Sequence, residues 1–216
     1  FAHALAAVLG FSYRRVQFTS DMLPADILGA NIFDQEKRTF TLHRGPIFTQ
    51  LLLADEINRS SPKTQSALLE AMEEHQVSID GQSTPLPDPF FVIATQNPMH
   101  QAGTYPLPES QLDRFLMQVT LGFPDRVIER QLFEGRNPRA ALQKTTAVVT
   151  LEQWFVLQAR VAEIKVSSSV LDYVQRLVDY TRYSGDFQWG LSPRAALGLM
   201  QAGRAWALLQ HRQFVV

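Results

Sequence analysis

The chain has 216 residues, 45% of them hydrophobic and 19% charged, which is the composition of an ordinary globular protein with ample core. Its net charge of −1 and pI near 6.6 exclude a general electrostatic attraction to nucleic acid or to anionic membranes. The absence of cysteine excludes disulfides and thiolate metal sites, and no apolar run approaches the ~18 residues of a membrane-spanning helix. We therefore expect a cytoplasmic protein.

Helix and strand patterns alternate along the first part of the chain. Residues 1–10 carry apolar side chains at helical spacing and end at a glycine, although no capping residue precedes them. Strand patterns follow at residues 13–19, 51–56, 90–95 and 115–121. The second and third are apolar almost throughout, as in strands buried on both faces, and a helix pattern between them begins at Pro62. This alternation predicts a parallel sheet flanked by helices.

Two segments interrupt the alternation with hairpin patterns. Residues 32–48 alternate around a charged tip, and residues 76–86 contain Asp80-Gly81, a dipeptide typical of a tight turn. We expect each to form a β-hairpin inserted into the α/β part of the chain.

The composition changes after about residue 136. Residues 137–150 have the pattern of a linker, and the rest of the chain carries apolar stripes at helical spacing. The sequence therefore predicts two domains, an α/β domain over residues 1–136 and an all-helical domain over residues 137–216.

Two adjacent carboxylates, Asp55 and Glu56, stand where the apolar run LLLADE ends. Ligands of open α/β sheets bind beyond the carboxyl ends of the strands. One carboxylate at such a place can bind Mg²⁺ while the other orients a water molecule. The same pattern also fits a strand that ends in solvated acids ahead of a helix, whose dipole favours negative charge.

Three further polar residues occupy the ends of predicted elements. Asn97 in ATQNP offers a neutral group for the attacking water or a phosphate oxygen, and it equally fits an Asn-Pro turn. Arg114 in LPESQLDRF directly precedes the last strand pattern, where an exposed arginine usually forms a surface ion pair. Arg194 in GLSPRA lies in the first turn of a helix, where the dipole disfavours a cation that has no anionic partner.

Taken in order, the motifs LLLADEINR, ATQNP, LPESQLDRF and GLSPRA resemble those of the MoxR family of AAA+ ATPases. The resemblance covers nearly the whole chain, including both hairpin segments and GPIF at residues 45–48. It implies an AAA+ P-loop NTPase core, with a parallel sheet, flanking helices and two hairpin insertions, followed by an all-helical lid domain.

The resemblance also implies roles for individual residues. Asp55 corresponds to the Walker B residue that binds Mg²⁺, Glu56 to the general base that activates water, and Asn97 to the first sensor. Arg114 resembles the arginine finger that reaches the nucleotide of the next subunit, and Arg194 resembles the second sensor that the lid presents to the γ-phosphate. Arg59 also matches the family pattern, and the only role we attach to it is a contact at the subunit interface.

The chain departs from the family pattern at the phosphate loop, because it contains no G-x-x-x-x-G-K-[ST]. GDFQWGLS has the glycine spacing at Gly185 and Gly190, but Leu191 stands in the place of the lysine and the segment lies in the helical part. We expect the family's first strand and phosphate loop to lie upstream of Phe1, so that residues 1–10 continue the helix that this loop opens.

The function that the resemblance implies is ATP hydrolysis with Mg²⁺, used to remodel protein partners during the maturation or assembly of complexes. It further implies a homo-oligomeric ring of six subunits and a von Willebrand A-like partner protein, with no nucleic-acid partner and no insertion into a membrane.

Two other classes stay open at this point. A nucleic-acid motor needs basic hairpin tips, whereas SIDGQST has no Lys or Arg and the other tip mixes Lys37 and Arg38 with acidic residues. A non-catalytic assembly module has no need of a complete set of catalytic residues, whereas Asp55, Glu56 and Asn97 are all present, together with Arg114.

Overall fold

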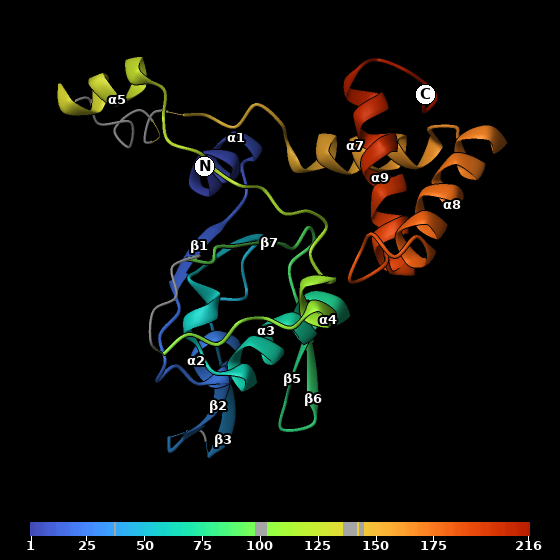
Figure 1. The fold of residues 1–216 in the computed structure, drawn as a ribbon. Coiled ribbons are helices and arrows are strands. Elements are labelled where there is room, and N and C mark those ends of the chain that lie inside the picture. The colour runs from blue at the N-terminus through green and yellow to red at the C-terminus, as the bar shows by residue number, and fades with distance from the viewer. Residues whose placement is uncertain (37, 98–102, 136–141, 143–144) are drawn as a thin grey trace. The chain divides into compact units, whose positions relative to one another are not determined.

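The computed structural model describes residues 1–36, 38–97, 103–135, 142 and 145–216 (Figure 1). The chain divides into two compact units. The first comprises Phe1–Arg114 and Leu121–Val148, and the second comprises Phe115–Thr120 and Val149–Val216. The predicted domain boundary between residues 136 and 137 lies outside the described residues, as do Lys37 of the first hairpin tip and Pro98 of the ATQNP motif.

A three-stranded parallel sheet forms the centre of the first unit. Its strands, in the order β1-β4-β7, are β1 (Tyr13–Gln17), β4 (Leu51–Asp55) and β7 (Phe91–Ala94). These bounds confirm three of the four predicted strands. Leu51, Leu52 and Ala54 of the central strand are fully buried, as its continuous apolar pattern predicts. The register places Gln17 beside Asp55, so that both strands end at the same level.

Helices of the first unit precede, connect and follow these strands, and several of them supply buried residues of its core. They are α1 (Ala2–Leu9), α2 (Pro24–Leu28), the 3-10 helix η1 (Ile57–Arg59), α3 (Pro62–Glu74), α4 (Glu109–Leu112) and α5 (Arg126–Phe133). Helix α3 begins as predicted, since the Ser61 hydroxyl accepts the Thr64 N–H and Pro62 occupies the first position. Its buried face includes Leu68 and Leu69, which are fully enclosed, and the helix packs against α2 and β5.

Both predicted hairpins are present. The first consists of β2 (Gly29–Asp34) and β3 (Thr39–Arg44) and starts three residues earlier than the pattern indicated. The second consists of β5 (Gln76–Ile79) and β6 (Gln82–Pro85), and its turn residues Asp80 and Gly81 have φ of 50° and 78°. Two successive positive φ angles are what a tight hairpin turn requires, and they explain the Asp-Gly sequence.

The fourth predicted strand, residues 115–121, is wrong, and Arg114 therefore does not precede a strand. The segment has no strand assignment, and most of its apolar side chains are exposed, with Leu116 at 58% and Leu121 at 83%. None of the described strands pairs with it. An alternating apolar pattern becomes a strand only where a neighbour accepts and donates its backbone hydrogen bonds.

The second unit is helical, as predicted. It contains α7 (Leu151–Glu163), α8 (Ser168–Tyr183) and α9 (Pro193–Leu209). Thr150, Ser167 and Ser192 cap these helices by accepting backbone N–H groups of the first turn. An isolated β-bridge joins Lys165 and Phe214 in the same unit. In the part of the chain that the structure describes, no helix combines the length and the apolar character needed to cross a membrane.

Candidate functional site

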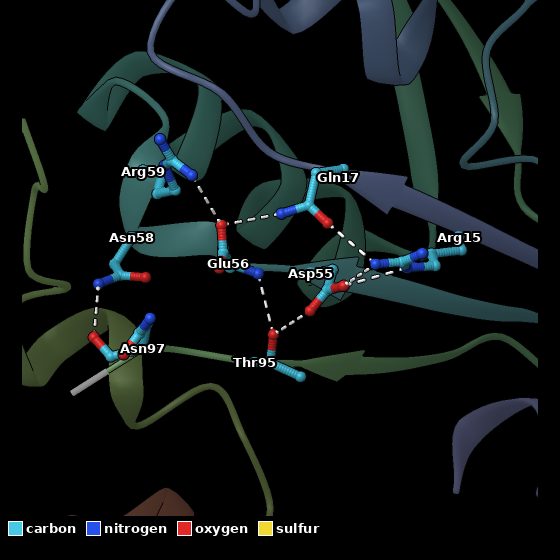
Figure 2. A network of polar contacts seen from close by, with 8 residues as sticks. All are labelled: Arg15, Gln17, Asp55, Glu56, Asn58, Arg59, Thr95 and Asn97. Atoms are coloured by element: carbon cyan, nitrogen blue, oxygen red, sulfur yellow. Dashed lines mark hydrogen bonds and ion pairs between the residues drawn. The ribbon is translucent and has the colours of Figure 1, made fainter. Parts of the chain in front are cut away.

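Asp55 and Glu56 lie at the carboxyl end of β4, where the chain turns sharply out of the sheet (Figure 2). Glu56 has φ 55° and ψ 48°, a left-handed conformation that a non-glycine residue rarely adopts, and η1 follows it directly. Because of this turn the two adjacent carboxylates have different partners. Backbone strain of this kind is common at functional sites.

The Asp55 carboxylate accepts hydrogen bonds from two neighbouring strands. Thr95, directly after β7, donates its hydroxyl to Oδ1 over 2.5 Å. Arg15 of β1 donates from Nε and Nη2 to Oδ2, over 3.0 and 2.5 Å. The Thr95 hydroxyl chiefly holds the pKa of Asp55 below its ordinary value; partial burial acts in the opposite direction, and the Arg15 guanidinium lowers the pKa further. Asp55 is therefore ionised at neutral pH.

The Glu56 carboxylate is held by other residues. Gln17 Nε2 and Arg59 Nη1 both donate to its Oε2, over 2.9 and 3.1 Å. Among the described residues none donates to Oε1, which is therefore the oxygen available to a further hydrogen-bond donor. The backbone N–H of Glu56 donates to Thr95 Oγ1 over 2.9 Å, so one hydroxyl links both acidic residues. Arg15 also donates to Gln17 Oε1, which closes the network.

Asn97 lies beside the turn that follows Glu56. Its backbone carbonyl accepts a long hydrogen bond of 3.4 Å from Asn58 Nδ2 (Figure 2). Thr95, two residues earlier, accepts the Ile57 N–H through its backbone carbonyl. The structure thus places the Asn97 backbone against the turn that follows Glu56.

The two arginines occupy other parts of the structure. Arg114 follows α4 and forms an ion pair with Glu73 of α3, with 3.1 Å between Nη2 and Oε2 and about a third of each side chain exposed. Arg194 belongs to the second unit, where it lies in the first turn of α9 behind the Ser192 cap. The ion pair with Glu73 places Arg114 against α3 and not among the described partners of Asp55.

Sequence reasoning missed several residues of this network. Arg15, Gln17 and Thr95 were not singled out, and Arg59, for which only an interface contact was expected, holds Glu56. Two signals were available. Arg15 and Gln17 are polar residues two apart in a strand that runs beside β4, and Thr95 ends an otherwise apolar strand pattern.

These residues fit a magnesium ion. Among the described residues, no three His, Asp or Glu side chains lie close enough together to hold a metal ion. Asp55 would therefore be a single carboxylate ligand. Mg²⁺ is commonly bound in this way, by one or two carboxylates together with water and substrate phosphates. Oδ1 accepts one hydrogen bond, from Thr95, and so keeps a second lone pair for the metal, whereas Oδ2 accepts both hydrogen bonds from Arg15.

The comparison with known proteins gives a consistent result along the whole chain. Residues 1–117 match the model of the ATPase family associated with various cellular activities (AAA), and residues 179–216 match the AAA lid domain. The chain is 44% identical over 213 residues to the uncharacterised protein YeaC of Bacillus subtilis, and 41% identical over 222 residues to the chaperone MoxR1 of Mycobacterium tuberculosis. These alignments cover 99% and 98% of this chain, and 67% and 58% of the two relatives.

A more distant relative and a solved structure agree with these matches. The protein MoxR of Methylorubrum extorquens is 27% identical over 237 residues, which are 99% of this chain and 68% of that protein. A crystal structure of a protein assigned as an ATPase, from Cytophaga hutchinsonii, superposes with a TM-score of 0.88 at 37% identity. That superposition covers 99% of this chain and 67% of the other.

Proposed function

This chain belongs to the MoxR family of AAA+ ATPases, and we propose that it hydrolyses ATP within a cytoplasmic, homo-oligomeric ring of six subunits. The ring would use this hydrolysis to remodel a protein client during the maturation or assembly of a complex, together with a von Willebrand A-like partner. The observation that carries the proposal of hydrolysis is the pair of adjacent carboxylates with separate partners at the end of β4.

In this proposal Asp55 is the magnesium ligand. Its low pKa keeps it anionic, and the bonds from Thr95 and Arg15 fix the direction of its oxygens. When bound, Mg²⁺ supplies positive charge beside the phosphates and neutralises charge that develops during phosphoryl transfer.

Glu56 is the general base. The left-handed turn directs its carboxylate away from that of Asp55, and Gln17 and Arg59 restrain it through Oε2. Oε1 is then the atom that accepts the proton of the attacking water. Restraint through one oxygen and proton transfer through the other allow the base to be positioned without being blocked.

The remaining proposed roles concern the phosphate groups. Asn97, beside the Glu56 turn, would orient the attacking water or a γ-phosphate oxygen as the first sensor. Arg114 would act as the arginine finger toward the nucleotide of the next subunit, after leaving its ion pair with Glu73. Arg194, in the first turn of α9, would reach the γ-phosphate as the second sensor.

The test is the substitution Glu56→Gln in the complete protein. An amide cannot accept the proton of water, so we expect Mg·ATP affinity to stay within about threefold while the steady-state turnover falls by a factor of about 10²–10⁴. Glu70→Gln, at an exposed position of α3, is the matched control and should hydrolyse ATP normally. Turnover of Glu56→Gln within twofold of the unmodified protein would exclude Glu56 as the base.

A further inference from the structure

Gln65 is a buried polar residue in the first turns of α3 that the proposed mechanism does not use. Its side chain is 1% exposed, although glutamine is usually a surface residue. Its amide nitrogen donates to three backbone carbonyls: to Ile57 over 3.3 Å, to Ser60 over 3.1 Å and to Tyr105 over 2.9 Å. The first two belong to the η1 turn directly after Glu56, and the third belongs to the segment that leads to Arg114.

The three carbonyls determine which way the Gln65 amide points. A flipped amide would place its oxygen against three other oxygens, so the nitrogen must face them. The oxygen Oε1 is then buried, and none of the described residues gives it a hydrogen bond. A buried oxygen without a hydrogen bond destabilises the fold. An apolar side chain of the same length would not carry this cost. The amide is therefore better explained by the carbonyls that it fixes than by packing.

The segment from Tyr105 to Arg114 is attached to the η1 turn and to α3 at further points. Its Tyr105 N–H donates to the Asn58 carbonyl of the η1 turn over 2.6 Å. Gln111 of α4 donates to Ser66 Oγ over 3.2 Å, and Arg114 pairs with Glu73 over 3.1 Å. Gln65 joins the η1 turn and this segment through one side chain, in addition to the backbone bond from Tyr105 to Asn58.

We propose that Gln65 is a positioning residue that sets the turn carrying Glu56 and the segment carrying Arg114 relative to each other. This inference rests on the proposed roles of Glu56 and Arg114. The Gln65 amide touches no reacting group itself. It acts by fixing the carbonyls of Ile57 and Ser60 on one side and of Tyr105 on the other. Small displacements of catalytic groups lower the rate far more than they lower substrate affinity.

The test compares two substitutions in α3 of the complete, ring-forming protein. Gln65→Met keeps the length of the side chain and removes both N–H donors. Leu69→Ala removes a fully buried apolar side chain from the same helix and removes no hydrogen-bond donor to these carbonyls, so it reports the effect of lost stability. For Gln65→Met we expect kcat for ATP hydrolysis to fall about 10- to 100-fold, with KM within about twofold. Leu69→Ala should lower Tm and leave kcat within about twofold.

The outcomes separate this inference from the proposed function. If the unmodified protein hydrolyses ATP, Glu56→Gln does not, and folded Gln65→Met has a normal kcat, the role of Gln65 is overturned while the function stands. A fall in kcat of equal size in Leu69→Ala would overturn it as well, because lost stability would then explain both. If the unmodified protein does not hydrolyse ATP, the proposed function itself fails.

A measurement on the unmodified protein covers the case in which Gln65→Met does not fold. Backbone amide hydrogen exchange of residues 57–60 and 103–107 reports how these two segments open. Because the Gln65 side chain and the Tyr105 N–H bond to Asn58 both join them, we expect the two segments to exchange at a common rate, within about threefold. Rates that differ by more than about tenfold would show that the segments open independently and would overturn the inference.

Discussion

Thr95 connects the two acidic residues of the site, since its hydroxyl donates to Asp55 and accepts the backbone N–H of Glu56. The first of these bonds is the main cause of the low pKa of Asp55. A carboxyl whose pKa is lower in the folded than in the unfolded chain stabilises the fold at pH values above its unfolded pKa of roughly 3.9. This contribution is lost as the pH falls through the folded pKa.

The substitution Thr95→Val should therefore change how stability depends on pH. Without the hydroxyl the pKa of Asp55 rises toward its ordinary value, so the loss of unfolding free energy as the pH falls below about 4 becomes smaller than in the unmodified chain. Thr95→Ser keeps the hydroxyl and should follow the unmodified curve. Urea unfolding at a series of pH values measures the effect. Parallel curves for Thr95→Val and the unmodified chain would contradict it.

At the scale of elements, the base of the first hairpin depends on two backbones that approach closely. A Cβ atom added to Gly45 would lie 2.1 Å from the Ile27 carbonyl oxygen and 2.5 Å from the Gly29 nitrogen. The Gly45 N–H donates to the Leu28 carbonyl, and Ile47 donates to Ile27, so this contact attaches the end of the hairpin to α2. Only a residue without a side chain fits here, which explains the first residue of the GPIF motif.

Gly45→Ala should accordingly destabilise the first unit. The added methyl group meets backbone atoms that cannot rotate away, so we expect a loss of about 1–3 kcal/mol, or a fall in Tm of roughly 2–12 °C. Gly122→Ala is the control, because a Cβ at Gly122 would meet nothing within 4 Å. Differential scanning calorimetry of both variants tests the expectation. Equal Tm values would show that the hairpin base has room for a side chain.

At the scale of the whole molecule, the proposed ring requires residues of two subunits at each nucleotide. Arg114→Ala alone and Glu56→Gln alone should each remove most of the hydrolysis, because every active site then lacks either its finger or its base. In mixed rings some interfaces combine the intact Glu56 of one subunit with the intact Arg114 of its neighbour. We expect an excess of Glu56→Gln subunits to restore measurable turnover to Arg114→Ala subunits in a steady-state ATPase assay.

The control for this mixing experiment is the size of each ring, measured by analytical ultracentrifugation. Both variants must assemble like the unmodified protein for the comparison to hold. If intact mixed rings stay inactive at every ratio, Arg114 does not act across a subunit interface.

Local patterns in the sequence determined much of the fold. The continuous apolar runs predicted β4 and β7, Asp80-Gly81 predicted the second hairpin turn, and Ser61-Pro62 predicted the start of α3. These features leave a trace in the sequence because burial on both faces, positive φ and end-capping each favour particular residues at adjacent positions. The four motifs and their order also determined the family, because each motif is a short contiguous stretch that can be found in the sequence directly.

The tertiary structure alone decided which side chains meet. Arg15 and Thr95 are each 40 residues from Asp55 in sequence, and they reach it because β1 and β7 lie on either side of β4. The 115–121 pattern failed for the same reason, because its apolar residues have no described strand as a neighbour. Periodicity records which face of a segment is apolar. It does not record which distant segment completes its hydrogen bonds, because that choice depends on how the whole chain packs.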